Sequence, residues 1–175
     1  MKNRIIKQYI DSLLGQKLLD ITCEADLLDI GFENRILHIS SQALGRVLKN
    51  NKILVTTLDY QSWDEKESVN NDEWYNVDRY RQDIVGGIVI SVKKSRCGDL
   101  FIKMSNGIRI EVLIGGGEHH YGDHDEQWVL FDKRGVKETL TFLTVFNDEI
   151  DYDELNIFEL INNNNPNLHH VDESG

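Results

Sequence analysis

The stretch that decides the fold is residues 84–114, IVGGIVISVKKSRCGDLFIKMSNGIRIEVLI. Apolar side chains alternate with more mixed ones in three successive segments, which is the period of a β-strand with one buried face. Because turn residues separate the segments, the stretch predicts three consecutive antiparallel strands, a β-meander. The alternating apolar residues are Ile88, Ile90 and Val92, then Leu100, Ile102 and Met104, then Ile108, Ile110, Val112 and Ile114.

The second turn of this meander fixes its register. A two-residue turn at Asn106-Gly107 would set Met104 opposite Arg109 and place the two apolar sets on opposite faces. A loop of about three residues instead sets Met104 opposite Ile108 and keeps the apolar sets together. We therefore predict a bulged hairpin in which Gly107 has a positive φ, which only glycine adopts without steric cost.

A similar pattern begins about 71 residues earlier in the chain. It predicts a duplicated β-meander, with repeats at about 13–58 and 84–146 and a fourth strand ending each repeat. The positions of Leu37 and Ile39 predict that the turn after Phe32 is about one residue longer than its counterpart. The matched residues are Leu14-Gly15, Leu18, Leu19, Ile21, Leu28, Ile30, Phe32 and Asn34 with Val85-Gly86, Val89, Ile90, Val92, Leu100, Ile102, Met104 and Asn106.

These repeats predict a mainly β, α+β fold that forms a sandwich or a curved half-barrel. Helical spacing of apolar residues predicts an N-terminal helix over residues 3–14 and a C-terminal helix over Asp153–Ile161. A short helix carrying Val77, Tyr80 and Ile84 is the alternative to a linker before the second repeat. We expect one globular domain over residues 1–161 and a flexible tail over 162–175.

Composition narrows the class of protein. Hydrophobic residues make up 40% and charged residues 28% of the 175 residues, which is typical of one globular domain. No apolar run reaches the length of about 20 residues that a membrane-spanning helix needs, and residues 1–9 lack the apolar core of a signal peptide. Cys23 and Cys97 form no CxxC pair, which favours reduced thiols. We therefore expect a cytoplasmic protein.

The net charge of −11 argues against nucleic-acid and anionic-membrane binding, since phosphate groups need clustered Lys and Arg. Residues 59–83 hold eight acidic and three basic residues, and residues 147–159 hold six acidic residues and no basic one. These two segments, at −5 and −6, account for the whole net charge. The acidity is therefore local, and a basic partner is expected.

The first acidic segment is the leading candidate site, because it carries aromatic side chains among its acids. Aromatic residues supply contact area at low entropic cost, and carboxylates steer and pair with a basic partner. The plain alternative is a solvated linker whose tryptophans fold back on the core. The candidate partner-binding residues are Trp63, Asp64, Glu65, Glu67, Asp72, Glu73, Trp74, Tyr75 and Asp78.

Three other kinds of site, for a metal, a phosphate group or a catalytic nucleophile, have weaker support than the acidic segment. Residues 118–126 combine three histidines with four carboxylates, but they lack the spacing of a metal motif, so a polar hairpin tip is favoured over a metal site. Gly86-Gly87 and residues 115–117 lack the context of a phosphate-binding loop and read as bends or bulges. No nucleophile motif such as GxSxG is present. We expect no catalytic residues, no metal and no cofactor.

The order of several short motifs resembles that of small uncharacterised bacterial proteins with duplicated β-meanders. Such proteins are suspected to be immunity proteins of polymorphic toxin systems. The resemblance spans about residues 13–131, implies no catalytic residues and does not include the acidic segment. Its motifs are Val85-Gly86, Gly98-Asp99-Leu100, Asn106-Gly107-Ile108 with Val112, and Glu126-Gln127-Trp128.

The leading hypothesis from the sequence is a cytoplasmic immunity or antitoxin-like protein that occludes a cognate, basic toxin. One alternative is a housekeeping β domain that binds a small molecule between its sheets. A metal-dependent enzyme built on His119, His120 and His124 is the third. A toxin-like reading frame beside the gene would favour the first, and metal analysis of the purified protein would test the third.

Overall fold

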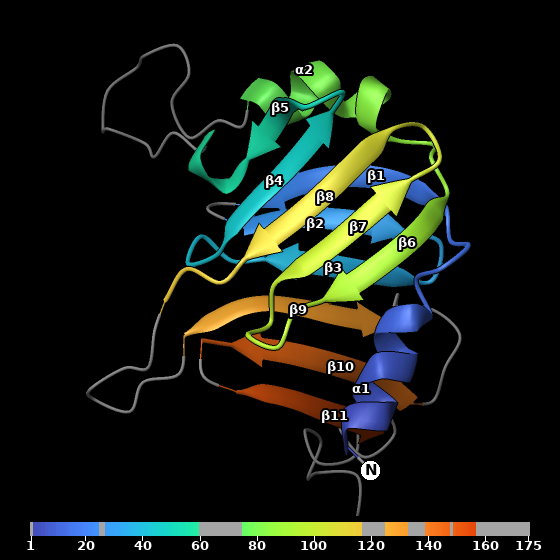
Figure 1. The fold of residues 1–175 in the computed structure, drawn as a ribbon, viewed down its shortest axis with the longest axis vertical. Helices are drawn as coiled ribbons and strands as arrows, with labels where there is room; N and C mark the ends of the chain where they lie inside the picture. Colours follow the sequence, from blue (N-terminus) through green and yellow to red (C-terminus); the bar gives the residue numbers. More distant parts are fainter. Residues whose placement is uncertain are drawn as a thin grey trace, which may run out of the picture.

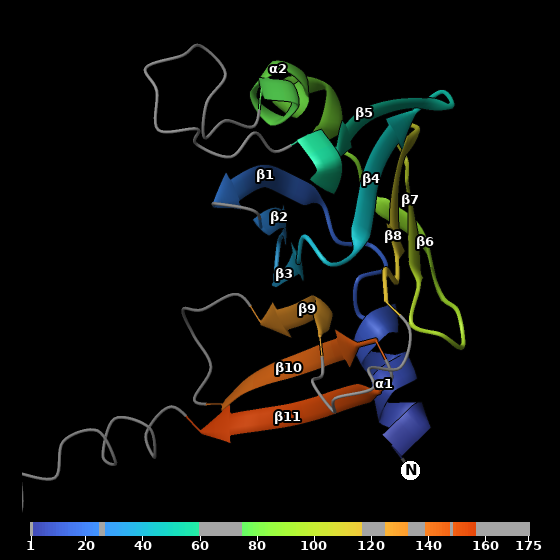
Figure 2. The same cartoon turned by 90° about the vertical axis from the view of Figure 1, so that its left-hand side faces the viewer.

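The computed structural model describes residues 2–24, 27–59, 75–116, 125–132, 139–147 and 149–156. Its strands form two antiparallel sheets stacked face to face (Figure 1, Figure 2). Sheet 1 contains, in spatial order, β1 (Leu18–Glu24), β2 (Leu27–Phe32), β3 (Arg35–Ile39), β9 (Glu126–Asp132), β10 (Thr139–Phe146) and β11 (Ile150–Asn156). Sheet 2 contains β5 (Lys52–Thr56), β4 (Leu44–Lys49), β8 (Ile108–Leu113), β7 (Leu100–Met104) and β6 (Val89–Lys94). The predicted mainly β fold is confirmed, and over the described residues the sheets form a sandwich and no closed barrel.

The β7–β8 hairpin has the predicted register. Ile102 lies opposite Ile110 and Leu100 lies opposite Val112, and all four side chains are buried. Gly107 has a φ of +82°, and its N–H donates to the carbonyl oxygen of Met104 at 3.2 Å. The requirement for one buried face, together with the conformational freedom of glycine, therefore sets this turn.

Replacing Gly107 by alanine should lower the free energy of unfolding by about 1–2 kcal/mol, because the new Cβ would strain a left-handed backbone. Gly31→Ala is the matched control, since a Cβ on Gly31 in β2 would meet its nearest atom at an ordinary 3.7 Å. We expect that control to be neutral or slightly stabilising. Urea denaturation followed by circular dichroism measures both, and equal losses would contradict the positive-φ explanation.

The first strand of the second meander differs from the prediction in its phase. Val89 is buried, whereas Ile88 is 46% and Ile90 61% exposed. A β-bulge between Val89 and Ser91 inserts an extra residue into β6 and reverses the alternation. The expectation that Ile88 and Ile90 face the core with Val92 was therefore wrong, and only Val92 of the three packs against the core.

The first meander, β1–β2–β3, is present as predicted, but its second turn is shorter than expected. Gly31 lies opposite Ile36 and Ile30 lies opposite Leu37, which leaves a turn of Glu33 and Asn34. This register keeps Leu37 and Ile39 on the buried face. The expectation of a turn longer than its counterpart was wrong, because a two-residue turn already brings the apolar residues into phase.

Each meander continues into a strand that joins the other sheet. Strand β4 follows β3 in the chain but pairs with β8, where Val47 lies opposite Ile110. Strand β9 follows β8 but pairs with β3, where Leu37 lies opposite Leu130. The fourth strands predicted from the sequence are thus present, and this reciprocal exchange joins the two halves of the chain into one sandwich.

The two halves also meet where β1 and β6 begin, and their hydrogen bonds there form reciprocal pairs. The N–H of Gly15 donates to Val89 at 2.9 Å, and the N–H of Gly86 donates to Leu18 at 2.8 Å. Lys17 and Ile88 form an antiparallel bridge at the centre of the crossing. Both the β1–β2 and the β6–β7 pairs have a bulge beside this crossing. These contacts are therefore related by a local, approximate two-fold symmetry. The duplication itself stays a prediction.

The C-terminal helix predicted for Asp153–Ile161 was wrong where the structure describes it. Residues 150–156 form strand β11, which pairs with β10 and places Phe142 opposite Asp153 and Leu143 opposite Tyr152. The unpaired edge of β10 offers this segment a full set of backbone partners, which outweighs its weak helical spacing. Residues 157–161 and the predicted tail, 162–175, lie outside the described residues.

The two helices lie toward opposite ends of the molecule (Figure 1). Helix α1 (Lys2–Asp11) is the predicted N-terminal helix, and it buries Ile6, Tyr9 and Ile10. Helix α2 (Tyr75–Ile84) buries Val77 and Ile84, as its apolar spacing indicated. The sandwich interior is filled by side chains with relative exposures below 2%, among them Trp128, Phe32, Leu28, Ile30, Leu37, Ile39, Leu100 and Ile102.

Candidate functional site

The acidic segment proposed as the partner-binding site is mostly outside the described residues. Trp63, Asp64, Glu65, Glu67, Asp72, Glu73 and Trp74 all fall within residues 60–74. The structure does describe both of its ends. The short 3-10 helix Thr57–Asp59 places the Asp59 carboxylate 2.9 Å from the Asn76 amide, which donates to it. The segment therefore leaves and re-enters the sandwich at one point beside α2.

Two predicted site residues lie on α2. Tyr75 is its first residue, and Asp78 follows in its first turn. The carboxylate of Asp78 lies 3.3 Å from the guanidinium of Arg81, and its side chain is 74% exposed. Burial raises the pKa of the nearby Cys23 thiol, and the charge of Asp78 adds to that shift. Asp78 is thus accessible to a partner but already shares its charge with Arg81.

The outer face of sheet 1 carries aromatic side chains that the sequence analysis did not single out. Phe131 of β9 and Phe142 of β10 stack with ring centroids 6.0 Å apart. They lie opposite each other in the strand register and point away from the buried Leu130 and Leu143. A shallow depression of about 390 Å³ surrounds them, lined by His38, Glu126, Val129, Phe131, Phe142, Thr144 and Asp153.

Acidic side chains flank this aromatic pair on the same face. Asp153 lies opposite Phe142 on β11, and Asp151 lies opposite Thr144. On the other side, the Asp29 carboxylate lies 2.5 Å from Nδ1 of His38. Together with Asp20 on the edge strand β1, these residues form what we call the acidic face: Asp20, Asp29, Phe131, Phe142, Asp151 and Asp153.

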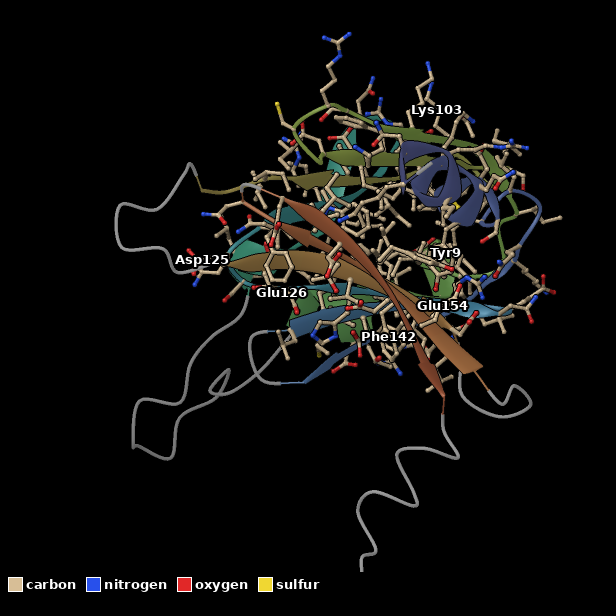
Figure 3. The ribbon with its side chains drawn as sticks, turned by 90° about the horizontal axis from the view of Figure 1, so that it is seen from below. Tyr9, Lys103, Asp125, Glu126, Phe142 and Glu154 are labelled. Carbon is tan, nitrogen blue, oxygen red and sulfur yellow. The ribbon has the colours of Figure 1, made fainter. Side chains whose placement is uncertain are left out.

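The outer face of sheet 2 has the opposite charge. One row across its strands is Arg46, Glu111, Phe101 and Lys93, and the next is Leu48, Arg109, Lys103 and Ser91. Arg46 forms an ion pair with Glu111 at 2.6 Å, and Arg109 donates to the Asn51 side chain at 3.0 Å. Figure 3 shows Lys103 on one side of the sandwich and Phe142 on the other. The two sheets thus separate basic from acidic side chains.

A buried polar network ties α1 to sheet 1, and the sequence analysis did not predict it. Arg35 forms an ion pair with Asp132, and these side chains are only 10% and 2% exposed. The Thr141 hydroxyl donates to Asp132 at 2.5 Å, and the Tyr9 hydroxyl donates to the carbonyl oxygen of Thr141 at 2.8 Å. Burial raises the pKa of the Tyr9 phenol. The Arg35 guanidinium lies 4.6 Å from the centre of the Tyr9 ring, which Figure 3 places between α1 and sheet 1.

Signals for this network are present in the sequence. Arg35 is in phase with the buried Leu37 and Ile39 of β3, and Asp132 is in phase with the buried Trp128 and Leu130 of β9. A charged residue at a core position needs a partner of opposite sign. The network holds α1 against sheet 1. The charges of Arg35 and Asp132 therefore have a structural rather than a catalytic role.

The cluster of histidines and acids at 118–126 is described only at Asp125 and Glu126. No group of three or more metal-ligating side chains occurs among the residues that the structure describes. Gly115 has a packing explanation, because a Cβ there would clash with the carbonyl oxygen of Gln42. Both cysteines are free thiols, as predicted.

Comparison with known proteins found no matching family model, no similar curated protein and no similar solved structure. No helix in the described part of the chain is long and apolar enough to cross a membrane.

Proposed function

We propose that this chain is a non-catalytic binding protein of the immunity type, which acts in the cytoplasm and neutralises a basic protein toxin by occluding it. The observation that carries the proposal is the acidic face, where two stacked, partly exposed phenylalanines share one face of the sheet with four carboxylates, two of them on the neighbouring strand β11. The sequence resemblance to suspected immunity proteins supports the choice of a toxin as the partner. Cofactors, nucleic acid and membranes have no part in the proposed function.

The binding mechanism combines electrostatic steering with aromatic anchors. The carboxylates of the acidic face and of residues 59–83 attract a basic surface and raise its association rate. Phe131 and Phe142 then lose their remaining solvent contact beneath the partner, which slows dissociation. The basic outer face of sheet 2 lies on the other side of the sandwich and takes no part in the proposed contact.

The acidic segment at 59–83 is the second part of the proposed interface. The amide of Asn76, on α2, donates a hydrogen bond to the carboxylate of Asp59, so the described residues on either side of residues 60–74 are held together. Asp20 on β1 lies near that helix, since its carboxylate is 3.9 Å from Arg81. The described part of the acidic segment, on α2, is therefore adjacent to the β1 edge of the acidic face.

Neutralising four acids of the segment should slow association with the toxin. The change is Asp64→Asn, Glu65→Gln, Asp72→Asn and Glu73→Gln, and the rate should fall about tenfold at low salt and much less at 0.5 M salt, where charges are screened. Phe142→Ala should instead raise the dissociation rate by about tenfold. Surface plasmon resonance with a toxin-like protein encoded beside this gene measures both rates, and absence of any such reading frame would count against the proposal.

The control is Lys93→Gln with Lys103→Gln on the opposite face, which should leave both rates within about twofold of the original. Growth of cells that express the toxin, with and without this chain, supplies the functional readout. Failure of the unmodified chain to restore growth would reject the immunity assignment. If the four acid changes and Phe142→Ala left both rates unchanged, the acidic interface would be wrong.

We further infer that the chain arose by duplication of a unit with one helix followed by a β-meander and a fourth strand. The reciprocal hydrogen bonds between Gly15 and Val89 and between Gly86 and Leu18 support this inference. The two bulges at matching positions and the mutual exchange of β4 and β9 support it as well. The acidic segment then lies between the two copies, where an insertion disturbs neither sheet.

A further inference from the structure

A large groove separates α1 from strand β6, the edge strand of sheet 2. Its volume is about 940 Å³, and its third wall is formed by Glu149 and Ile150 at the start of β11. The partly buried Val92 of β6 and Ile150 supply its apolar surface, and the buried Ile6 and Ile10 of α1 lie beneath it. At the other end of the molecule α2 packs directly on β1, where Arg81 reaches Asp20.

The charged side chains of the groove are mainly basic, in contrast to the net charge of the chain. Five basic residues line it against two acidic ones: Lys2, Lys7, Lys93, Lys94 and Arg96 against Asp11 and Glu149. Two of the basic residues are neutralised, because Lys7 pairs with Asp11 and Lys2 lies 3.2 Å from Asp151. Within the described residues, Lys93, Lys94 and Arg96 have no carboxylate within ion-pair distance.

We propose that this groove binds a small amphipathic anion, a carboxylate or phosphate with an acyl or aromatic body, whose charged group contacts Lys94 and Arg96. The apolar body would lie against Val92 and Ile150, from which binding would exclude water. The volume is within the range of small-molecule sites, and an apolar wall with a few convergent polar groups is their usual composition. The proposal is independent of the toxin-binding function.

The environment of Lys94 supports an anion at this position. Lys94 is half-buried, and its ammonium donates to the carbonyl oxygen of Ser95 at 2.7 Å. Burial lowers the pKa of this ammonium, while the neighbouring Cys97 and Asp99 act in the opposite direction. A bound anion would offset part of the desolvation of the charged form. The neighbouring Lys93 and the basic outer face of sheet 2 extend the positive potential that attracts such a ligand.

Sodium decanoate is a suitable probe, because it combines one carboxylate with a flexible apolar chain. Titration of the full chain, followed by the NMR signals of its side-chain methyl groups, should give saturable shifts at Ile6, Ile10, Val92 and Ile150, with a Kd below about 1 mM. The methyl signals of Val129 on the acidic face should not move. Absence of saturable shifts at the groove would overturn the proposal.

Two double variants test the site, and each removes two positive charges. One pair lies in the groove and the other lies outside it. Lys94→Met with Arg96→Met should weaken decanoate binding by about tenfold or more, because each removes a charge-assisted hydrogen bond. Lys17→Met with Lys103→Met should leave the affinity within about twofold, since both side chains are exposed and lie outside the groove. Equal weakening by the two pairs would mean that only overall charge matters, which contradicts a defined site.

Three further probes of the unmodified protein separate the proposed ligand from its alternatives. Neutral 1-decanol should bind at least about tenfold more weakly than decanoate, and equal binding would mean an apolar patch without anion recognition. Saturable shifts of the groove methyl signals by a polyglutamate peptide, without a response to decanoate, would assign the groove to an acidic protein segment. Binding to phosphatidylglycerol vesicles without binding of free decanoate would assign it to a membrane surface. Either of the last two results would overturn the proposal.

Discussion

Asp132→Asn is expected to lower the free energy of unfolding by about 3–5 kcal/mol, because it leaves the buried Arg35 without a counter-charge. The asparagine keeps the size of the side chain and one acceptor for the Thr141 hydroxyl. What it removes is the negative charge beside a guanidinium that is only 10% exposed. Urea denaturation at pH 7, followed by circular dichroism, measures the loss.

The expected loss of stability comes from leaving the buried charge of Arg35 uncompensated, rather than from the lost attraction between Arg35 and Asp132. Asp132 is also the acceptor of the Thr141 hydroxyl and N–H, at 2.5 and 3.2 Å, so its carboxylate has replaced much of its lost hydration. The Nε atom of Arg35 has no hydrogen-bond partner in the described structure. Arg35 therefore depends on Asp132 for its stability in the interior, and single replacements of either residue should be severe.

A double-mutant cycle distinguishes this explanation from simple loss of packing. Arg35→Met alone should cost about as much as Asp132→Asn, but the double variant should cost clearly less than the sum of the two. The control is Asp83→Asn, which breaks an ion pair with Lys49 whose side chains are 34% and 59% exposed. It should cost less than about 1 kcal/mol. Additive losses at Arg35 and Asp132 would show that the two charges are not coupled.

Most of the strands and the turn at Gly107 could be predicted because they depend on neighbours in the sequence, whereas the predicted length of the turn after Phe32 was wrong. The period of two in residues 100–113 and the glycine at 107 together determine one hairpin register. The phase of β6 could not be predicted, because the bulge at Val89 to Ser91 breaks the alternation without a sequence signal such as glycine. Strand β11 was mistaken for a helix, because pairing with a distant strand overrides a short apolar spacing.

The exchange of β4 and β9 between the sheets is the long-range feature that local patterns do not contain. It determines which side chains become neighbours, and therefore how the acidic face and the basic outer face of sheet 2 are composed. Phe131 and Phe142 form a pair only because β9 and β10 are adjacent, and the basic rows of sheet 2 require β4 beside β8. Counting charges along the chain found two acidic segments, whereas the sandwich separates basic from acidic side chains across its thickness.

Trp128→Ala is expected to lower the free energy of unfolding by about 3–5 kcal/mol, since it removes the largest fully buried side chain among the described residues. Trp128 belongs to β9 in sheet 1, but its indole N–H donates to the carbonyl oxygen of Gly98 at 2.9 Å. Gly98 lies in the β6–β7 hairpin of sheet 2 and has a φ of +106°. One side chain therefore supplies both packing and a hydrogen bond between the sheets.

Trp128→Phe separates the two contributions, because it keeps most of the packing and removes the donor. It should cost about 1–3 kcal/mol, as the buried carbonyl of Gly98 is left unpaired. Phe131→Ala, on the opposite face of the same strand, is the control for strand propensity and should cost less than Trp128→Ala, because the Phe131 ring retains solvent contact. Equal losses for Trp128→Ala and Phe131→Ala in urea denaturation would mean that β9 contributes through its backbone pairing alone. A larger loss for Trp128→Ala than for Phe131→Ala would instead show that β9 of sheet 1 stabilises the β6–β7 hairpin of sheet 2 through the Trp128 side chain.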